Sequence, residues 1–314
     1  MSKNEQSAEE IKQAAEKKKP TLSDAELTGK LKLEKAKAVI GKIILYPMAI
    51  IAILSVFRGK IGYFILFMAI AMIAATVSTS AGKKLKTLTS DNLIRGALET
   101  VFDNVVYEPF SKMPGPVIDE AHMDFPFRYN KIDGNDHIKA TYKGLNIEMA
   151  DVTLIEETVT MDDDGNMSTT ETNRFVGLWL VCDFGKELSA DLRLSERGKF
   201  GKIFGGRGVK TENDAFNKRF CITTDVEVEA FYILTPHMME YILSMDDRGD
   251  GDTYISFLRS GKVHIAINSG RDSFEIGKTK VSDPSALRQK FVDEIRYVTD
   301  LIDELQLVDT LYKK

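Results

Sequence analysis

Residues 39–57 read VIGKIILYPMAIIAILSVF and residues 61–77 read IGYFILFMAIAMIAATV, and these two apolar runs decide the fold. As helices they would be about 28 and 26 Å long, close to the roughly 30 Å hydrocarbon core of a bilayer. Neither run has the polar stripe of an amphipathic helix, and two in succession would need a very large core. A signal peptide does not fit, because the second run follows the first at once. The sequence therefore predicts a transmembrane helical hairpin.

The turn between the two runs sets the topology of the hairpin. Only Arg58-Gly59-Lys60 separates the runs, so the helices must be antiparallel and both outer flanks lie on one side of the membrane. The flanks hold more basic residues than the turn, and the positive-inside rule then places both termini in the cytoplasm. We expect a multi-pass protein of the cell (inner) membrane. The expected membrane-flank anchors are Lys37, Lys42, Arg58, Lys60, Lys83, Lys84 and Lys86.

Charge is uneven along the chain. Residues 39–86 contain six basic residues and no acids, whereas residues 87–314 contain 27 basic and 40 acidic residues, a net charge of −13. An acidic domain is a poor ligand for phosphate backbones, so we expect no nucleic-acid partner. The two cysteines, Cys182 and Cys221, are expected to be small buried hydrophobes. We expect no metal and no cofactor, because neither cysteine belongs to a ligand cluster.

Three domains are expected. Residues 1–38 are a charged cytoplasmic helical segment, with helices at 2–19 and 23–38 and with Ser23 and Glu26 forming a capping box. Residues 39–80 are the transmembrane hairpin. Residues 87–314 are a soluble α+β domain.

Within the soluble domain, alternating apolar residues predict a mainly antiparallel sheet with flanking helices and a long C-terminal helix. A helix is expected at 87–110, another from Pro236, and the last at 283–311. Strands are expected at 138–142, 145–157, 158–161, 175–184, 226–235, 254–258 and 263–267. The fold class is α+β.

The C-terminal helix carries a heptad seam with two interpretations. Its members are Phe291, Ile295, Val298, Ile302 and Leu305. The seam either packs on the sheet or joins a partner helix in a coiled coil. An oligomer could form through this helix or through the transmembrane hairpin.

A glycine-rich basic stretch covers residues 193–210. Its cationic members are Arg193, Arg197, Lys199, Lys202, Arg207 and Lys210, with Glu196 the one acid. The phosphate-loop pattern G-x-x-x-x-G-K-[ST] is absent. Two interpretations remain: a flexible solvated loop, or a contact for anionic lipid or an acidic partner.

Catalytic motifs give no assignment. The acidic stretches 162–166 and 246–252 fail as calcium loops, since a loop starting at Asp246 has Arg248 and Phe257 where oxygen ligands are needed. Both stretches are expected to be turns. A catalytic site therefore stays unknown, although acids such as Asp183, Asp214 and Asp225 could form one.

Several short pieces resemble a known family. They include Phe216-Asn217-Lys218, the run from Tyr232 to Pro236, Tyr107-x-Pro109 and Asp183-Phe184-x-Lys186. Together they resemble the uncharacterised bacterial membrane-protein family that is defined by a domain of unknown function and often found beside LemA-type proteins. The likeness covers about residues 93–274 and departs after Lys186. It implies a bacterial membrane protein of unassigned activity and supplies no catalytic residues.

Taken together, the sequence predicts a membrane-tethered cytoplasmic interaction or accessory module rather than an enzyme. Its expected partners are the lipid bilayer and a membrane protein. The alternative is a membrane-bound hydrolase or transferase with an acidic site of unfamiliar type. A transporter is disfavoured, because two spans enclose no pathway and neither has a charged group at its midplane.

Overall fold

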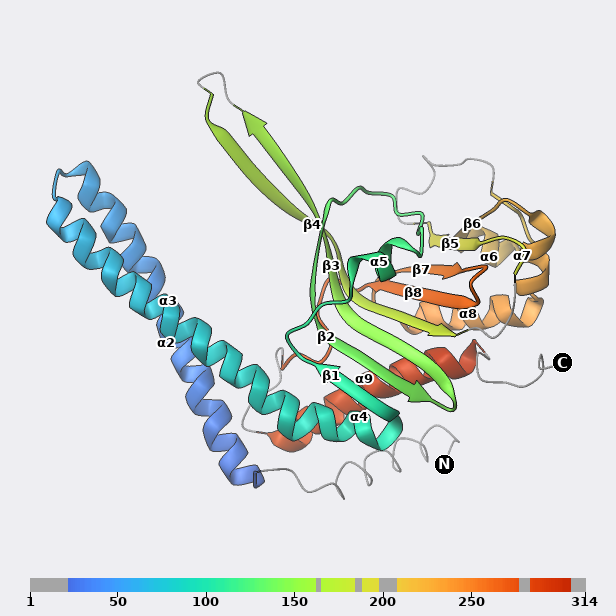
Figure 1. Cartoon of the computed structure of the whole chain (residues 1–314), viewed down its shortest axis with the longest axis horizontal. Helices are drawn as coiled ribbons and strands as arrows, with labels where there is room; N and C mark the ends of the chain where they lie inside the picture. The colour runs from blue at the N-terminus through green and yellow to red at the C-terminus, as the bar shows by residue number, and fades with distance from the viewer. Residues whose placement is uncertain (1–21, 162–164, 184–187, 198–207, 277–282, 306–314) are drawn as a thin grey trace. The chain divides into compact units, whose positions relative to one another are not determined.

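The computed structural model describes residues 22–161, 165–183, 188–197, 208–276 and 283–305. Figure 1 shows the chain with its elements labelled. The helices are α2 (Asp24–Phe57), α3 (Ile61–Thr89), the π-helix η1 (Ser90–Ile94), α4 (Arg95–Val101), α5 (Gly115–Asp119), α6 (Asp214–Arg219), α7 (Glu227–Ile233), α8 (Pro236–Arg248) and α9 (Pro284–Glu304). The strands are β1 (Asp103–Glu108), β2 (Lys131–Tyr142), β3 (Leu145–Met161), β4 (Met167–Asp183), β5 (Leu192–Glu196), β6 (Phe220–Thr224), β7 (Asp252–Phe257) and β8 (Lys262–Asn268).

The chain divides into two compact units. The first comprises the described residues up to 100 together with 275–276 and 283–293, and the second comprises the described residues of 101–274 and 294–305. Helix α9 contributes residues to both units. The domain boundaries expected near residues 38, 80 and 87 stay a prediction.

The helical unit is built on α2 and α3. The expected capping box is present: Ser23 Oγ accepts from the Glu26 backbone N–H at 3.4 Å, and Glu26 accepts from the Ser23 backbone N–H at 3.1 Å. The helix then runs without interruption to Phe57, so the expected charged helix and the first apolar run are one element. The expected helix at 2–19 lies outside the described residues.

The expected helix at 87–110 is wrong in its second half. Helix α3 passes through the π-turn of η1 into α4, which ends at Val101. Residues 103–108 then form the edge strand β1, whose Val106 and Tyr107 pair with β2. The spacing of the apolar residues in this stretch is compatible with a helix or with a strand. Pairing with a neighbouring strand decided the outcome, because β-branched residues fit a pleated surface well.

The second unit contains one antiparallel sheet of eight strands, in the order β1-β2-β3-β4-β8-β7-β5-β6. This confirms the predicted α+β class. The β2–β3 hairpin turns at Lys143 and Gly144, whose φ angles of 48° and 84° are those of a type I′ turn. Strand β4 begins at Met167, eight residues earlier than expected. The distal parts of β3 and β4 leave the sheet as a long two-stranded ribbon (Figure 1).

Both faces of the sheet are covered. On one face, Phe175, Trp179 and Tyr254 pack with the segment around α5, which contributes Met113 and Ile118. The alternate residues of the same strands are equally buried on the other face, and Met149, Leu180 and Ile265 are cross-strand neighbours there. Central strands buried on both faces explain the near-continuous apolar runs of β4 and β8.

The expected strand at 226–235 is wrong, because its core is the helix α7. Only Ala230 and Ile233 are buried in it, a helical spacing of three, while the apolar side chains between them face outward. The alternation of VEVEAFYILT suits a strand, but no strand pairs with it among the described residues. The predicted start of the next helix is confirmed: Thr235 caps α8 by accepting from the Met238 N–H at 3.2 Å, and Pro236 follows.

Helix α9 is described from Pro284 to Glu304, and residues 306–311 of the predicted helix lie outside the described residues. The whole heptad seam is buried within the chain: Phe291, Ile295, Val298, Ile302 and Leu305 are at most 1% exposed. A seam buried within the chain favours intramolecular packing over a coiled coil with a partner helix.

Candidate functional site

The hairpin helices meet along a seam of small residues. Its buried members are Gly41, Ala52 and Ser55 of α2 and Ala71, Ala74, Ser78 and Ala81 of α3. Ser78 Oγ donates to the Ala38 carbonyl at 2.9 Å. A side chain at Gly41 would meet Ser78 Cβ at 2.8 Å and the Ala74 carbonyl at 2.9 Å. Small residues let two backbones approach closely, which is the usual packing of helices in lipid.

The outer surface of the same hairpin is apolar and exposed. Ile43 is 64% exposed, Ile61 68% and Met72 67%. Both helices are long and apolar enough to cross a membrane, and only 17% of the most apolar window of each is buried. A core helix of a soluble protein would be mostly buried. The exposed surface therefore favours a lipid environment over a protein core.

The predicted flank anchors differ in their surroundings. Lys42, Arg58, Lys60, Lys83 and Lys84 are exposed, and the Lys60 ammonium lies 5.5 Å from the centre of the Tyr63 ring. The remaining two make ion pairs. Lys37 Nζ lies 2.7 Å from Glu34 Oε1, and Lys86 Nζ lies 3.0 Å from Glu275 Oε1.

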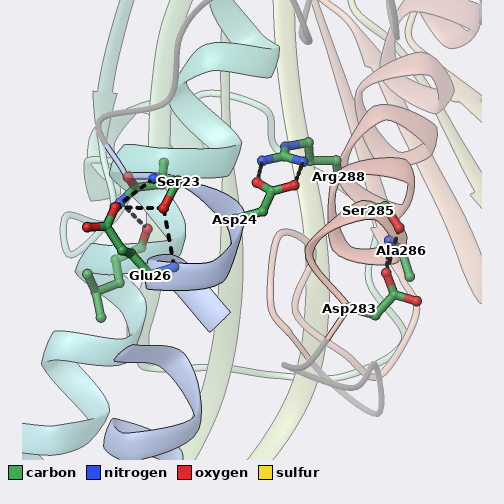
Figure 2. A network of polar contacts seen from close by, with 9 residues as sticks. Ser23, Asp24, Glu26, Asp283, Ser285, Ala286 and Arg288 are labelled. Atoms are coloured by element: carbon green, nitrogen blue, oxygen red, sulfur yellow. Dashed lines mark hydrogen bonds and ion pairs between the residues drawn. The ribbon is translucent and has the colours of Figure 1, made fainter. Parts of the chain in front are cut away.

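A polar network at the start of α2 was not foreseen from the sequence (Figure 2). Arg288 of α9 donates two hydrogen bonds to the Asp24 carboxylate, the one from Nη1 at 3.1 Å. This hydrogen-bonded pairing lowers the pKa of Asp24. At the start of α9, Asp283 accepts from the Ala286 N–H at 3.0 Å, which caps that helix. The partners are more than 260 residues apart, so no local pattern in the sequence could reveal the pair.

The predicted basic stretch is only partly described, since Lys199, Lys202 and Arg207 lie outside the described residues. Arg193 donates to the His122 carbonyl at 3.5 Å and lies 3.4 Å from Asp124. Arg197 Nε donates to the Phe220 carbonyl at 3.2 Å. Lys210 is exposed. Two of the three described cations therefore bind groups of their own domain, and Lys210 remains turned to solvent.

An acid–base cluster around the buried Asp246 lies at the end of β5, and no sequence pattern predicted it. Arg219 Nε lies 3.1 Å from Glu196 Oε1 and also donates to Asp246. The Asp246 side chain is 0% exposed, and its Oδ1 has no hydrogen-bond partner. Burial raises the pKa of Glu196 to about 7, the Asp246 carboxylate adds to this, and the Thr253 N–H that Glu196 accepts at 2.9 Å opposes it.

This cluster corrects the reading of residues 246–252 as a turn. Asp246 and Arg248 belong to helix α8, and the turn begins only at Gly249. The acid at 246 is a buried helical group that pairs with Arg219.

A second buried carboxyl lies in the sheet. Asp151 is 2% exposed and accepts from the Ser273 N–H at 2.9 Å, while its Oδ2 has no hydrogen-bond partner. Burial raises its pKa well above the ordinary value, and the neighbouring Asp136, 0% exposed, adds to that effect. An uncharged Asp151 is the state that this position favours.

An open cleft of about 390 Å³ lies on the sheet, where β3 begins and β4 ends. Its charged lining residues are Lys139, Glu148, Asp183 and Lys262. Lys139 Nζ lies 3.6 Å from Glu148 Oε1, and Asp183 accepts from Asn146 Nδ2 at 3.1 Å. Lys139 and Glu148 thus pair within the cleft, whereas Asp183 binds a neutral amide and Lys262 Nζ lies 2.7 Å from Glu120 Oε1, outside the lining.

The three acids named for a hydrolase or transferase are not gathered in this cleft. Asp183 lines it, whereas Asp214 begins α6 and Asp225 follows β6, both exposed to solvent and neither part of its lining. Among the described residues, no group of three or more His, Cys, Asp or Glu side chains could hold a metal ion.

Comparison with known proteins identifies one domain. No curated protein and no solved structure matches the chain. The family model described as "Protein of unknown function (DUF3137)" matches residues 173–307, which run from β4 through α9. The match overlaps the later part of the resemblance seen in the sequence, and it extends to the C-terminal helix. A DUF3137 domain, of unknown function, is therefore found at residues 173–307.

Proposed function

We propose that the chain is a membrane-tethered interaction module of the bacterial inner membrane. Helices α2 and α3 cross the bilayer as a hairpin, both termini are cytoplasmic, and the α+β unit acts at the inner leaflet as an accessory subunit. The observation that carries the proposal is the hairpin itself: a sealed small-residue seam inside and exposed apolar side chains outside.

The short turn supports the proposed topology. Gly59 adopts a φ of 68°, and the Lys60 N–H bonds to the Ser55 carbonyl at 2.9 Å, which closes the reversal within three residues. No soluble segment is available between the helices to lie across the membrane. With both flanks on one side, the lysine-rich side is the cytoplasmic one.

The topology is tested by cysteine accessibility in oriented inner-membrane vesicles. A cysteine at Gly59 should react with a membrane-impermeant maleimide only from the periplasmic side, and a cysteine at Thr87 only from the cytoplasmic side. Both positions are exposed in the structure. Labelling of both from the same side would refute a hairpin that crosses the bilayer.

The basic stretch is proposed as a contact to anionic lipid or an acidic membrane-protein partner, such as a LemA-type protein. Because Arg193 and Arg197 bind within the domain, the informative variant reverses Lys199, Lys202 and Lys210 to Glu. For this variant, co-sedimentation of the detergent-purified chain with anionic liposomes should fall. Reversal of Lys112, Lys139 and Lys218, three exposed lysines outside the stretch, changes the net charge equally and is the matched control. Equal losses in both variants would argue against a specific role for the stretch.

A further inference from the structure

The distal part of the β3–β4 ribbon (Figure 1) has two open edges. Among the described residues, 156–161 of β3 and 167–174 of β4 are in register only with each other, whereas β2 and β8 flank the same strands nearer the sheet. Residues 158–161 and 165–174 are all exposed to solvent. A two-stranded ribbon alone is marginally stable in water, and an exposed strand edge is a template for a further strand.

Side-chain amides close both edges at the base of this ribbon. Asn130 accepts from the Glu157 N–H and donates to the Glu157 carbonyl, both at 2.8 Å. On the other edge, Asn268 accepts from the Val176 N–H at 3.0 Å and donates to the Arg174 carbonyl at 3.4 Å. Each amide takes the place of a neighbouring strand at one position. The flanking strands of the sheet therefore end at these amides, and the edge that can accept a strand lies beyond them.

The pairing within the ribbon shows which backbone groups of β4 face outward. The Glu157 N–H and C=O face away from β4, since they bind the side-chain amide at the base. Glu171 is directly opposite Glu157, so its N–H and C=O face away from β3. The direction alternates along a strand, so every second residue from Met167 to Asn173 presents its N–H and C=O outward. Residues 167–173 are called the β4 edge below.

The β4 edge lacks the features that keep exposed edges from pairing. Natural edges are guarded by lysines, prolines and bulges. The β4 edge contains no proline and one charged residue, Glu171, whose carboxylate lies 2.6 Å from Lys131 Nζ. Its register with β3 is regular, since the shift between the two strands lies at the base, between Leu154 and Ile155. An unguarded edge of this length favours pairing with another strand.

We propose that the β4 edges of two copies of this chain pair antiparallel about a two-fold axis at Thr170. Outward backbone groups must face each other, so Thr169 pairs with Glu171 of the second copy, and Met167 pairs with Asn173 of the second copy. This register places Thr170 opposite itself and sets no like charges opposite each other. The edge is thus complementary to itself, which is why the occupant is a second copy.

The proposed contact is small. Seven residues from each copy bury much less surface than a stable dimer does, so the association should be weak and should depend on concentration. Cross-linking is the measurement that captures such a contact. The proposal concerns the ribbon alone, and it holds or fails independently of the membrane topology proposed above.

The test is a disulfide cross-link in the full-length protein purified in detergent, with Cys221→Ser as the background. Thr170→Cys should form a disulfide-linked dimer under mild oxidation, because residue 170 faces its own copy in a pair without hydrogen bonds, with Cα atoms about 4.5 Å apart. Thr158→Cys is the matched control. Thr158 is exposed and directly opposite Thr170, but it lies one strand farther from the axis, roughly 14 Å from its own copy and beyond the reach of a disulfide.

A dimer that forms through Thr170→Cys alone supports the proposal. Equal cross-linking of the two variants, or none with Thr170→Cys, overturns it. The same oxidation is carried out in membranes before purification. A disulfide there between Thr170→Cys and another protein, in place of the dimer, also overturns it and assigns the edge to that protein.

A second measurement links the disulfide to backbone pairing. Thr169→Pro removes an N–H that faces outward, so the hydrogen bonds within the ribbon are kept and one across the axis is lost. Added to Thr170→Cys, it should slow cross-linking severalfold. Thr169→Val keeps the N–H and should leave the rate unchanged. An unchanged rate with Thr169→Pro, or an equal loss with Thr169→Val, would show that the two edges do not pair through their backbones.

Discussion

The hairpin and the sheet unit solve the packing problem in opposite ways. In the hairpin the smallest residues, such as Gly41 and Ser78, face inward and the largest apolar ones face outward. In the sheet unit the largest side chains, such as Trp179 and Phe175, are completely buried. This difference is the one expected if lipid surrounds the hairpin and water surrounds the sheet unit. Water drives large apolar groups inward, whereas lipid leaves close backbone contact as the main source of helix association.

The largest expected effect comes from the sheet core. Trp179 is 0% exposed and contacts the rings of Phe125 and Phe175 at centroid distances near 6 Å. Trp179→Ala should lower the free energy of unfolding by about 3–5 kcal/mol, because it opens a cavity that the neighbours cannot fill. Chemical denaturation followed by far-UV circular dichroism measures the loss. Val159→Ala on the exposed ribbon is the control, and a comparable loss there would contradict the packing described.

The hairpin should respond to added bulk. Gly41→Val would place atoms within 3 Å of Ser78 and Ala74, so we expect the two helices to separate, at a cost of about 1–3 kcal/mol. Disulfide trapping between cysteines placed on α2 and α3 reports the separation. Gly62→Val is the matched control, since nothing lies within 4 Å of a side chain built there. If the α2–α3 disulfide forms equally well in both variants, the small-residue seam is not what holds the helices together.

The buried acid cluster should make the stability of the sheet unit depend on pH. Glu196 has a pKa of about 7 in the folded chain against an ordinary 4.5, so the folded state binds the proton more tightly than the unfolded state. Its contribution to stability is complete below about pH 4.5 and is lost as pH rises through about 7. Glu196→Gln should reduce the fall in Tm between pH 5 and pH 8. A fall as steep as in the wild type would assign the dependence to other groups.

The smallest effect is expected at the Asp24–Arg288 pair. The Asp24 side chain is 56% exposed, so solvent screening limits the pair to about 0.2–1 kcal/mol. A double-mutant cycle with Asp24→Ala and Arg288→Ala measures the coupling through Tm. The charge-swapped double variant, Asp24→Arg with Arg288→Asp, should recover part of it. Additive single effects would mean that the two groups are independent.

The sequence predicted well the features that neighbouring residues set, and it predicted poorly the elements that depend on distant partners. The capping box at Ser23, the hairpin turn at Gly144 and the helix start at Pro236 depend on neighbouring residues only, and each is confirmed. The errors at 103–108 and 226–235 exchanged strand for helix. In both stretches the apolar spacing suits either element, and the presence or absence of a neighbouring strand decided between them.

The candidate sites also divide into one that consecutive residues predict and one that only distant contacts create. The two long apolar helices were foreseen because the length and apolarity that a bilayer requires fall on consecutive residues, which can be read along the chain. The cluster of Glu196, Arg219 and Asp246 was missed, because its members come from β5, α6 and α8. In the sequence, these three residues cannot be distinguished from charged residues of the surface.

The sequence alone predicted the apolar helical hairpin, its tight turn and the α+β class, because these depend on local length, period and turn chemistry. Tertiary structure alone decided which residues form the hairpin seam, which acids are buried and where α7 lies. Those outcomes depend on contacts between residues far apart in the chain, such as Ser78 with Ala38 and Arg219 with Asp246. Burial changes the energy of a charge or a side chain, and burial exists only once the chain has folded.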